Sequence, residues 1–242
     1  ILLVGPAGVG KDTLVSYLAL NLSKDRIPAG LRDYRLISLS LSSLFEDIQE
    51  PLEVFNRLTK ITKELLVNRD IVLYLPQFHN YKSLAQKGGF NALDTFQSLV
   101  NASWVPIIAA ATPEDYRRYL ETDSIVKENF EIIRVKELTT EESITFLSLR
   151  SLELQRKTRI KISFKAIKRA VNLAQRFLGS IPLPSSAESL LTEALEGARR
   201  QGKKIVKEQD IVDLVSLKTQ IPLDISSEEE KEKLLNLEKL VH

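Results

Sequence analysis

The feature that most constrains this chain is a glycine-rich loop set between an apolar run and a helical pattern. Ile1–Val4 is apolar and ends at glycine, as a buried parallel strand does, and the loop reads Gly5-Pro6-Ala7-Gly8-Val9-Gly10-Lys11. Apolar residues then recur at helical spacing from Asp12 to Leu22. Backbone N–H groups, a helix N-terminus and a lysine together can hold phosphate groups. The order strand, loop, helix therefore predicts a phosphate-binding loop rather than an empty glycine turn.

Composition narrows the class of protein. With 242 residues, the chain has room for one large or two smaller domains, and no run approaches the length of a membrane span. There are no cysteines and only two histidines, which excludes disulfides, thiolate catalysis and Cys-rich or His-rich metal sites. A net charge of +2 argues against a dedicated nucleic-acid binder. We expect a cytoplasmic protein without membrane partners and, because methionine is absent, a piece of a longer chain.

Strands and helices alternate after the loop. Apolar runs predict strands at 35–41, 71–75, 105–110 and 131–135, and helical spacing predicts helices at 53–67 and 85–100. This alternation is typical of an α/β fold with a doubly wound parallel sheet covered on both faces.

The pattern becomes helical only from about residue 139. Thr139-Thr140-Glu141-Glu142 resembles a helix cap, and helices are expected at 141–155, 163–178, 185–199, 207–217 and 228–241. The predicted division is an α/β nucleotide-binding-type domain (1–138), a small helical lid domain (139–225) and a linker helix (226–242). The basic cluster at 199–204 is interpreted as an exposed helix end.

The position after the loop lysine departs from the phosphate-loop motif. The motif has a Ser or Thr hydroxyl that binds Mg²⁺, whereas this chain has Asp12 followed by Thr13. A second negative charge about 4 Å from a phosphate costs on the order of 4 kcal/mol near a protein surface. The pattern thus predicts ATP or ADP as ligand, with little support for Mg²⁺. The candidate nucleotide-binding residues are Gly5, Gly8, Val9, Gly10, Lys11, Asp12 and Thr13.

Segments along the whole chain, in order, resemble the first ATPase module of double-ring Clp-type AAA+ unfoldases. They are the first strand and Walker A loop at 1–11, a turn at 27–31, a sensor 1 segment at 109–117, an arginine-finger helix at 123–130, a small-domain turn at 183–187, and an exit segment at 221–223 with 232–238. The resemblance implies an AAA+ P-loop fold, a ring hexamer, protein substrates and a second, active module beyond His242. A peptidase partner would act through regions not in this sequence.

The departures from that family fall on catalytic positions. The Walker B Asp-Glu pair falls on Pro76 and Gln77, the sensor 1 threonine on Ala111, and the arginine fingers on Glu128 and Asn129. The aromatic pore loop falls near 49–52, which has no aromatic residue, and His79 matches a family histidine that we interpret as structural. Proline cannot hold a metal ion, and glutamine is not a general base.

The replacement of these catalytic residues favours one function and leaves two alternatives. The chain is predicted to be a hydrolysis-inactive AAA+ module of a Clp-like, ATP-dependent unfoldase that serves assembly or regulation, which leaves its status as an enzyme open. The first alternative is a nucleotide-binding or slow ATPase module, because Lys11 and the loop glycines are intact. The second is a small-molecule kinase, suggested by Gly10-Lys11-Asp12-Thr13, but no arginine-rich lid is evident. Nucleic acid is not an expected partner.

Overall fold

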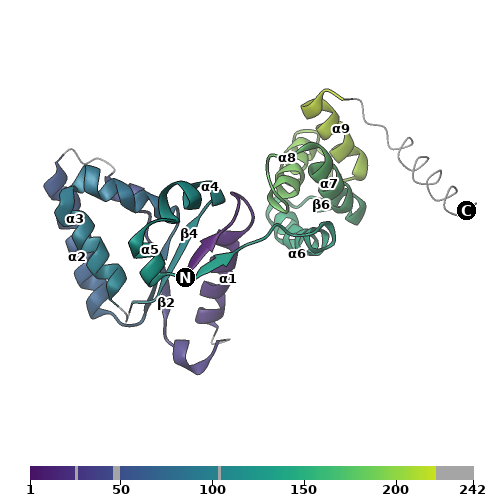
Figure 1. Ribbon diagram of the computed structural model, residues 1–242. Coiled ribbons are helices and arrows are strands. Elements are labelled where there is room, and N and C mark those ends of the chain that lie inside the picture. The colour runs from purple at the N-terminus through teal and green to yellow at the C-terminus, as the bar shows by residue number, and fades with distance from the viewer. Residues whose placement is uncertain (25–26, 46–49, 103–104, 222–242) are drawn as a thin grey trace, which may run out of the picture. The chain divides into compact units, whose positions relative to one another are not determined.

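The computed structural model describes residues 1–24, 27–45, 50–102 and 105–221 and divides into two compact units, Ile1–Lys136 and Glu137–His242 (Figure 1). The linker helix predicted at 226–242 lies outside the described residues. None of the helices in the described ranges is long and apolar enough to cross a membrane.

The first unit is built on a five-stranded parallel sheet with the order β2-β3-β4-β1-β5. The prediction of a doubly wound α/β fold is confirmed. The strands are β1 (Leu2–Val4), β2 (Arg35–Ser38), β3 (Ile71–Leu75), β4 (Ile107–Ala111) and β5 (Ile132–Arg134). Because β1 lies between β4 and β5, the loop that follows β1 leaves the sheet beside the carboxyl end of β4.

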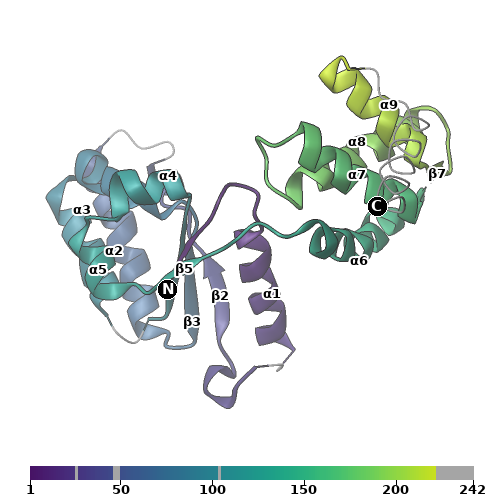
Figure 2. The same cartoon turned by 45° about the vertical axis from the view of Figure 1, so that its right-hand side comes forward.

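Helices cover both faces of this sheet. They are α1 (Lys11–Ser23), α2 (Pro51–Val67), α3 (Ser83–Asn101), the short α4 (Pro113–Asp115) and α5 (Ser124–Asn129). Short helical turns occupy Ala29–Leu31, Ser42–Phe45, Phe78–Lys82 and Tyr116–Leu120. Alternate residues of β3 belong to different cores: Leu73 packs with α2 and α3, whereas Tyr74 packs with Val15 of α1. Figure 2 shows α1 on one side of the sheet and α2, α3 and α5 on the other.

The second unit is a helical bundle with its own core. It contains α6 (Thr140–Thr158), α7 (Phe164–Phe177), α8 (Ser185–Arg200) and α9 (Glu208–Thr219). The helix cap expected at 139–142 is present: the backbone N–H of Glu142 donates to Thr139 Oγ1 at 3.3 Å, and the backbone N–H of Thr139 donates to Glu142 Oε2 at 2.8 Å. These reciprocal bonds satisfy two otherwise unpaired donors at the start of α6.

The expectation that this part is helical only was wrong. Two short parallel strands, β6 (Lys161–Ile162) and β7 (Ile205–Val206), pair with the register Lys161↔Ile205 and Ile162↔Val206. A two-residue strand is too short to display the period-two pattern by which strands are predicted. Their pairing brings two distant segments of the chain together.

Candidate functional site

Two glycines of the loop adopt a backbone conformation that other residues rarely adopt. Gly8 and Gly10 have φ angles of 81° and 100°, in the left-handed region that favours glycine. A Cβ atom on Gly5 would lie 2.8 Å from the carbonyl oxygen of Val135, so this position requires glycine for a different reason. The Gly5 N–H donates to the carbonyl of Ala111 at 3.2 Å, which joins the loop to the end of β4.

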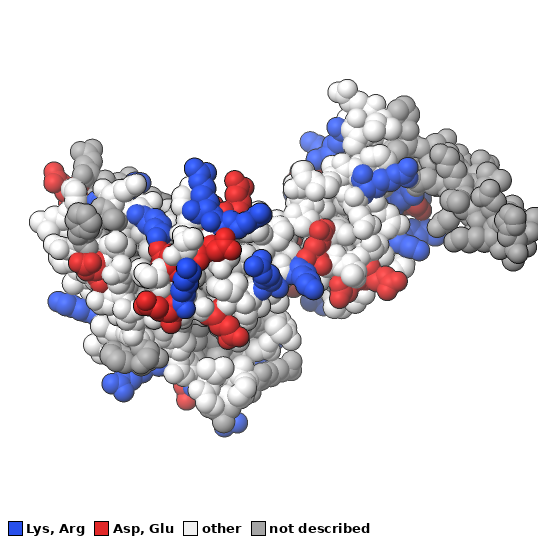
Figure 3. Space-filling model, in the orientation of Figure 1, with Lys and Arg blue, Asp and Glu red and all other residues white. Residues whose placement is uncertain are grey.

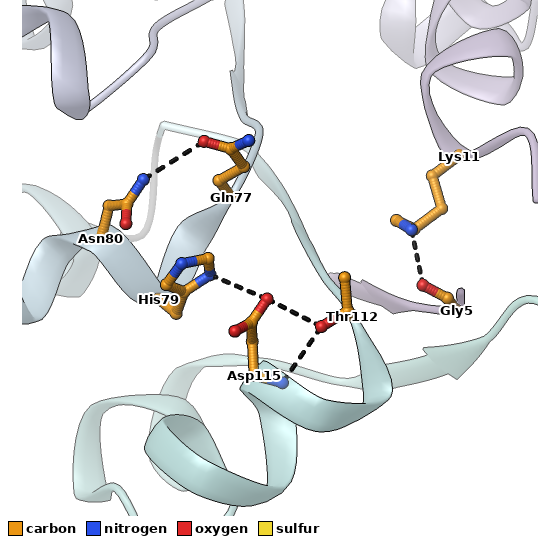
Figure 4. Close-up of polar contacts among 7 residues, drawn as sticks. All are labelled: Gly5, Lys11, Gln77, His79, Asn80, Thr112 and Asp115. Atoms are coloured by element: carbon orange, nitrogen blue, oxygen red, sulfur yellow. Dashed lines mark hydrogen bonds and ion pairs between the residues drawn. The ribbon is translucent and has the colours of Figure 1, made fainter. Parts of the chain in front are cut away.

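Lys11, at the start of α1, is turned back over the loop. Its Nζ donates to the carbonyl oxygen of Gly5 at 2.5 Å and to that of Pro6 at 2.8 Å (Figure 4 draws the first of these). Burial lowers the pKa of Lys11, and the carboxylates of Asp12 and Asp115 oppose that shift. An ammonium group has three N–H donors, so these two carbonyls leave one for an anionic ligand.

Asp12 is held by a residue of the sheet. The hydroxyl of Tyr74, from β3, donates to Asp12 Oδ1 at 2.5 Å. Tyr74 is only 5% exposed, and burial together with this hydrogen bond raises the pKa of its hydroxyl. Thr13 is exposed on α1, and Val9 is buried beneath the loop. The carboxylate where the motif has a metal-binding hydroxyl is therefore engaged by the protein itself.

The carboxyl end of β3 carries no acid. Leu75 ends the strand, and Pro76 and Gln77 follow. Gln77 has a φ of 51°, and its Oε1 accepts a hydrogen bond from Asn80 Nδ2 at 3.3 Å (Figure 4). Ala111 ends β4 and is 3% exposed, so a methyl group stands where a sensor hydroxyl would be.

A different acid, Asp115, lies close to the loop lysine. Thr112 Oγ1 donates to Asp115 Oδ2 at 2.7 Å and accepts from the Asp115 backbone N–H at 3.1 Å, which caps α4. His79 Nδ1 lies 3.4 Å from the same carboxylate oxygen, and its ring stacks on Tyr119 (Figure 4 shows the polar contacts). Sequence reasoning placed Thr112 and Asp115 in the sensor 1 segment at 109–117 but did not name either as a site residue. The Thr-Pro-Glu-Asp order at 112–115 is the capping signal that could have found them.

The remaining predicted positions lie on α5 and at the start of α2. Glu128 and Asn129 are exposed on α5, and Asn129 Nδ2 donates to the carbonyl of Ile125 in its own helix. Of the predicted pore segment, Pro51 opens α2 and Leu52 is 66% exposed, while Gln49 lies outside the described residues.

The donor set tests which ligand fits the loop. Left-handed glycines, a helix N-terminus and a lysine suit a phosphate group. The side chains beside the loop offer a divalent cation few ligands, because Pro76 has no side-chain ligand atom and one carboxylate oxygen of Asp12 accepts the hydrogen bond from Tyr74. Within the described residues no group of three or more His, Asp or Glu side chains is placed to hold a metal ion.

The chain is similar to Clp and Hsp104 proteins over most of its length. No family model matches it. It is 28% identical to chaperone protein ClpB of Aquifex aeolicus over 98% of this chain and 24% of ClpB. It is 30% identical to heat shock protein 104 of Schizosaccharomyces pombe over 81% of this chain and 22% of that protein. The chain thus spans about a quarter of the length of these relatives.

The fold is also similar to solved structures. The Hsp104–ADP complex of S. cerevisiae matches with a TM-score of 0.84 and 26% identity, covering 99% of this chain and 42% of that one. A closed-state Hsp104 structure with ATPγS and FITC-casein matches with a TM-score of 0.81 and 26% identity. The similarity in sequence and fold therefore covers both units.

Proposed function

The chain is a homologue of the Clp and Hsp104 AAA+ chaperones, and on that premise we propose that it is a module that does not hydrolyse ATP. It would contribute assembly or regulation to a Clp-like unfoldase, as part of a ring hexamer that acts on protein substrates. ATP-driven work would belong to another module of the same chain.

The observation that carries this proposal is that, among the described residues, no acidic side chain directly follows β3 at the sheet edge beside the loop. Pro76 and Gln77 occupy the end of β3, so neither a metal ligand nor a general base stands there. The two acids close enough to affect Lys11 each accept a hydrogen bond from within the protein: Asp12 Oδ1 from Tyr74, and Asp115 Oδ2 from Thr112.

Two further positions point the same way. Ala111 cannot orient a water molecule or a γ-phosphate. In the homologous module an arginine would approach the neighbouring subunit's phosphates, whereas Glu128 is an exposed carboxylate of opposite charge. Groups of these kinds each contribute about 10²-fold or more to rate, so their joint loss predicts negligible turnover.

The loop itself favours a second candidate, a nucleotide bound as a structural ligand. Gly8 and Gly10 keep left-handed backbone, and Lys11 is positioned over the loop. Nucleotide would supply the anionic charge that Lys11 and the start of α1 are arranged to receive. Asp12, bonded to Tyr74, would remain on the sheet side.

ATPase activity of the purified chain tests the proposal. We expect phosphate release at the background rate, unchanged by Lys11→Ala. We also expect no rescue by Pro76→Asp with Gln77→Glu, because Ala111 and Glu128 remain. Turnover that vanishes in the Lys11→Ala variant would refute the proposal.

Binding of a fluorescent ATP analogue, with and without Mg²⁺, separates the two candidates. Micromolar binding that is lost in Lys11→Ala would establish nucleotide as a structural ligand. Absence of binding would leave assembly as the role of the module. Binding that requires Mg²⁺ would contradict the expectation that the cation is not part of the site.

A further inference from the structure

The two units differ in charge. The first unit, 1–136, has sixteen Lys and Arg and sixteen Asp and Glu, and on the face shown in Figure 3 the two kinds are interspersed over it. The described part of the second unit, 137–221, has fifteen Lys and Arg but ten Asp and Glu. The described part of the second unit therefore has five more cations than acids, whereas the two kinds are equal in number in the first unit.

The basic residues of that unit lie in two runs without acids. Residues 154–187 contain eight Lys and Arg and no Asp or Glu, and residues 197–207 contain five Lys and Arg and no Asp or Glu. Only the second run stands out as a cluster in the sequence. The first is spread over the end of α6, β6 and α7.

The β6–β7 pair joins the two runs. The Lys161 N–H donates to the carbonyl of Lys204 at 3.0 Å, and the Ser163 N–H donates to that of Val206 at 3.0 Å. The ends of α6 and α8 thus meet at the start of the two strands, and the starts of α7 and α9 meet at their end. We call six exposed cations along this junction the basic patch: Arg159, Lys161, Lys165, Lys168, Lys204 and Lys207.

The cations of the patch are not explained by the fold. Lys203, next to the patch, has an acidic partner in Asp210, but within the described residues no ion pair joins a patch member to an acid. Lys165 lies in the first turn of α7, which has no acid, and Lys207 is the N-cap of α9. Cations at helix N-termini oppose the helix dipole, so Lys165 does not stabilise α7, whereas Lys207 lies near Asp210 and helps to lower the pKa of that carboxyl.

An exposed aromatic ring lies among these cations. Phe164 opens α7 between Lys161 and Lys165 and is 62% exposed. Ile205, paired in register with Lys161, is 37% exposed. Cations that neutralise phosphates, together with a ring on which a base can stack, are the combination that binds single strands. An acidic peptide would use the cations but has no need of the ring.

We propose that the basic patch and Phe164 form a binding site for single-stranded nucleic acid. The lysines and Arg159 contact backbone phosphates, and Phe164 stacks on a base. The site lies within the second unit and does not depend on the phosphate-binding loop or on the proposed function. It also revises the expectation, drawn from net charge alone, that nucleic acid is not a partner.

The test is fluorescence anisotropy of the full chain with a labelled oligothymidylate about 16 nucleotides long, which matches the longest single-domain sites. Binding should weaken with salt with a logarithmic slope of about −3 to −4, corresponding to about five phosphate contacts. The variant with Lys161→Gln, Lys165→Gln and Lys204→Gln should lose at least about tenfold in affinity and reduce the steepness of the slope by about 2.

Three exposed lysines of the first unit provide the matched control. Lys60→Gln, Lys63→Gln and Lys127→Gln together remove the same charge.

Phe164→Ala should weaken binding about fivefold or more without changing the salt slope, and Phe164→Trp should restore the affinity.

Three results would overturn the proposal. The first is no binding at about 50 mM salt, and the second is an equal loss of affinity in the control variant. The third is that Phe164→Ala has no effect and poly-glutamate competes as well as oligothymidylate. The last result would assign the patch to acidic proteins. Unchanged circular dichroism of each variant ensures that the loss of a contact, not of the fold, is measured.

Discussion

The hydrogen bond between Tyr74 and Asp12 allows a quantitative prediction. Tyr74 is 5% exposed, and its hydroxyl lies 2.5 Å from Asp12 Oδ1. Tyr74→Phe keeps the ring, so no cavity forms, and water can solvate the carboxylate on the exposed start of α1. We expect Tyr74→Phe to lower the free energy of unfolding by about 1 to 2 kcal/mol, which is toward the low end of the range for a hydrogen bond to a charged group.

The reverse change should cost more. Asp12→Ala leaves the buried hydroxyl of Tyr74 without an acceptor, which costs about 1 to 3 kcal/mol. It also removes an acid from the first turn of α1, where a negative charge stabilises the helix by about 0.3 to 1 kcal/mol. Asp12→Ala should therefore destabilise the first unit more than Tyr74→Phe does.

A double-mutant cycle in urea, followed by circular dichroism, measures the coupling between the two residues. We expect a coupling energy of about 1.5 kcal/mol. It is read from the unfolding transition of the first unit, because the chain has two compact units. Tyr17→Phe is the control, because Tyr17 is 64% exposed on the same helix. A coupling below about 0.5 kcal/mol would refute the reasoning, since it would mean that the bond contributes nothing in solution.

Three other outcomes follow from the contacts described. Gly5→Ala should destabilise the first unit by about 1 to 3 kcal/mol in urea, because its Cβ would crowd the backbone, whereas Gly30→Ala, in open space, should be near neutral. Burial would raise the pKa of Asp123, but hydrogen bonding, chiefly from Lys82, holds it below the usual value. A carboxyl whose pKa is lower in the folded than in the unfolded chain stabilises the fold at pH values above the unfolded pKa. The free energy of unfolding should therefore fall below about pH 4, and it should fall less in Lys82→Met. An unchanged acid profile would contradict this. Thr139→Ala should lower the thermal stability of the second unit by about 1 kcal/mol, and a loss confined to the first unit would exclude the capping role.

The parts of the fold that could be predicted are those that depend on short stretches of sequence. The buried run Ile71–Leu75 predicted β3, and glycines with a lysine predicted the loop after β1. Ends of elements were less accurate: β2 stops at Ser38 and β4 begins at Ile107, because residues beside a strand are apolar too. At Gly89, within α3, the backbone leaves the helical region with a φ of 73°, so two helical segments meet there at a kink.

The candidate site was predicted only in part. Its loop residues were identified from the motif, but whether those residues bind nucleotide stays a prediction. Tyr74 was taken for one more apolar position of a strand, and Asp115 was named only as part of the segment 109–117. Tyr74 and Asp12 are 62 residues apart, and no local pattern reveals which carboxylate a hydroxyl will meet. The contact between Thr112 and Asp115 is local and follows a capping pattern.

The sequence by itself determined the alternation of strands and helices, the glycine conformations of the loop and the lack of acids after β3, because each depends on residue type and near neighbours. Only the tertiary structure decided that Tyr74 hydrogen-bonds to Asp12, that His79 lies beside Asp115, and that the two basic runs meet at β6 and β7. These contacts join residues distant in the chain, and the packing of the sheet and the bundle, not local preference, sets which of them meet.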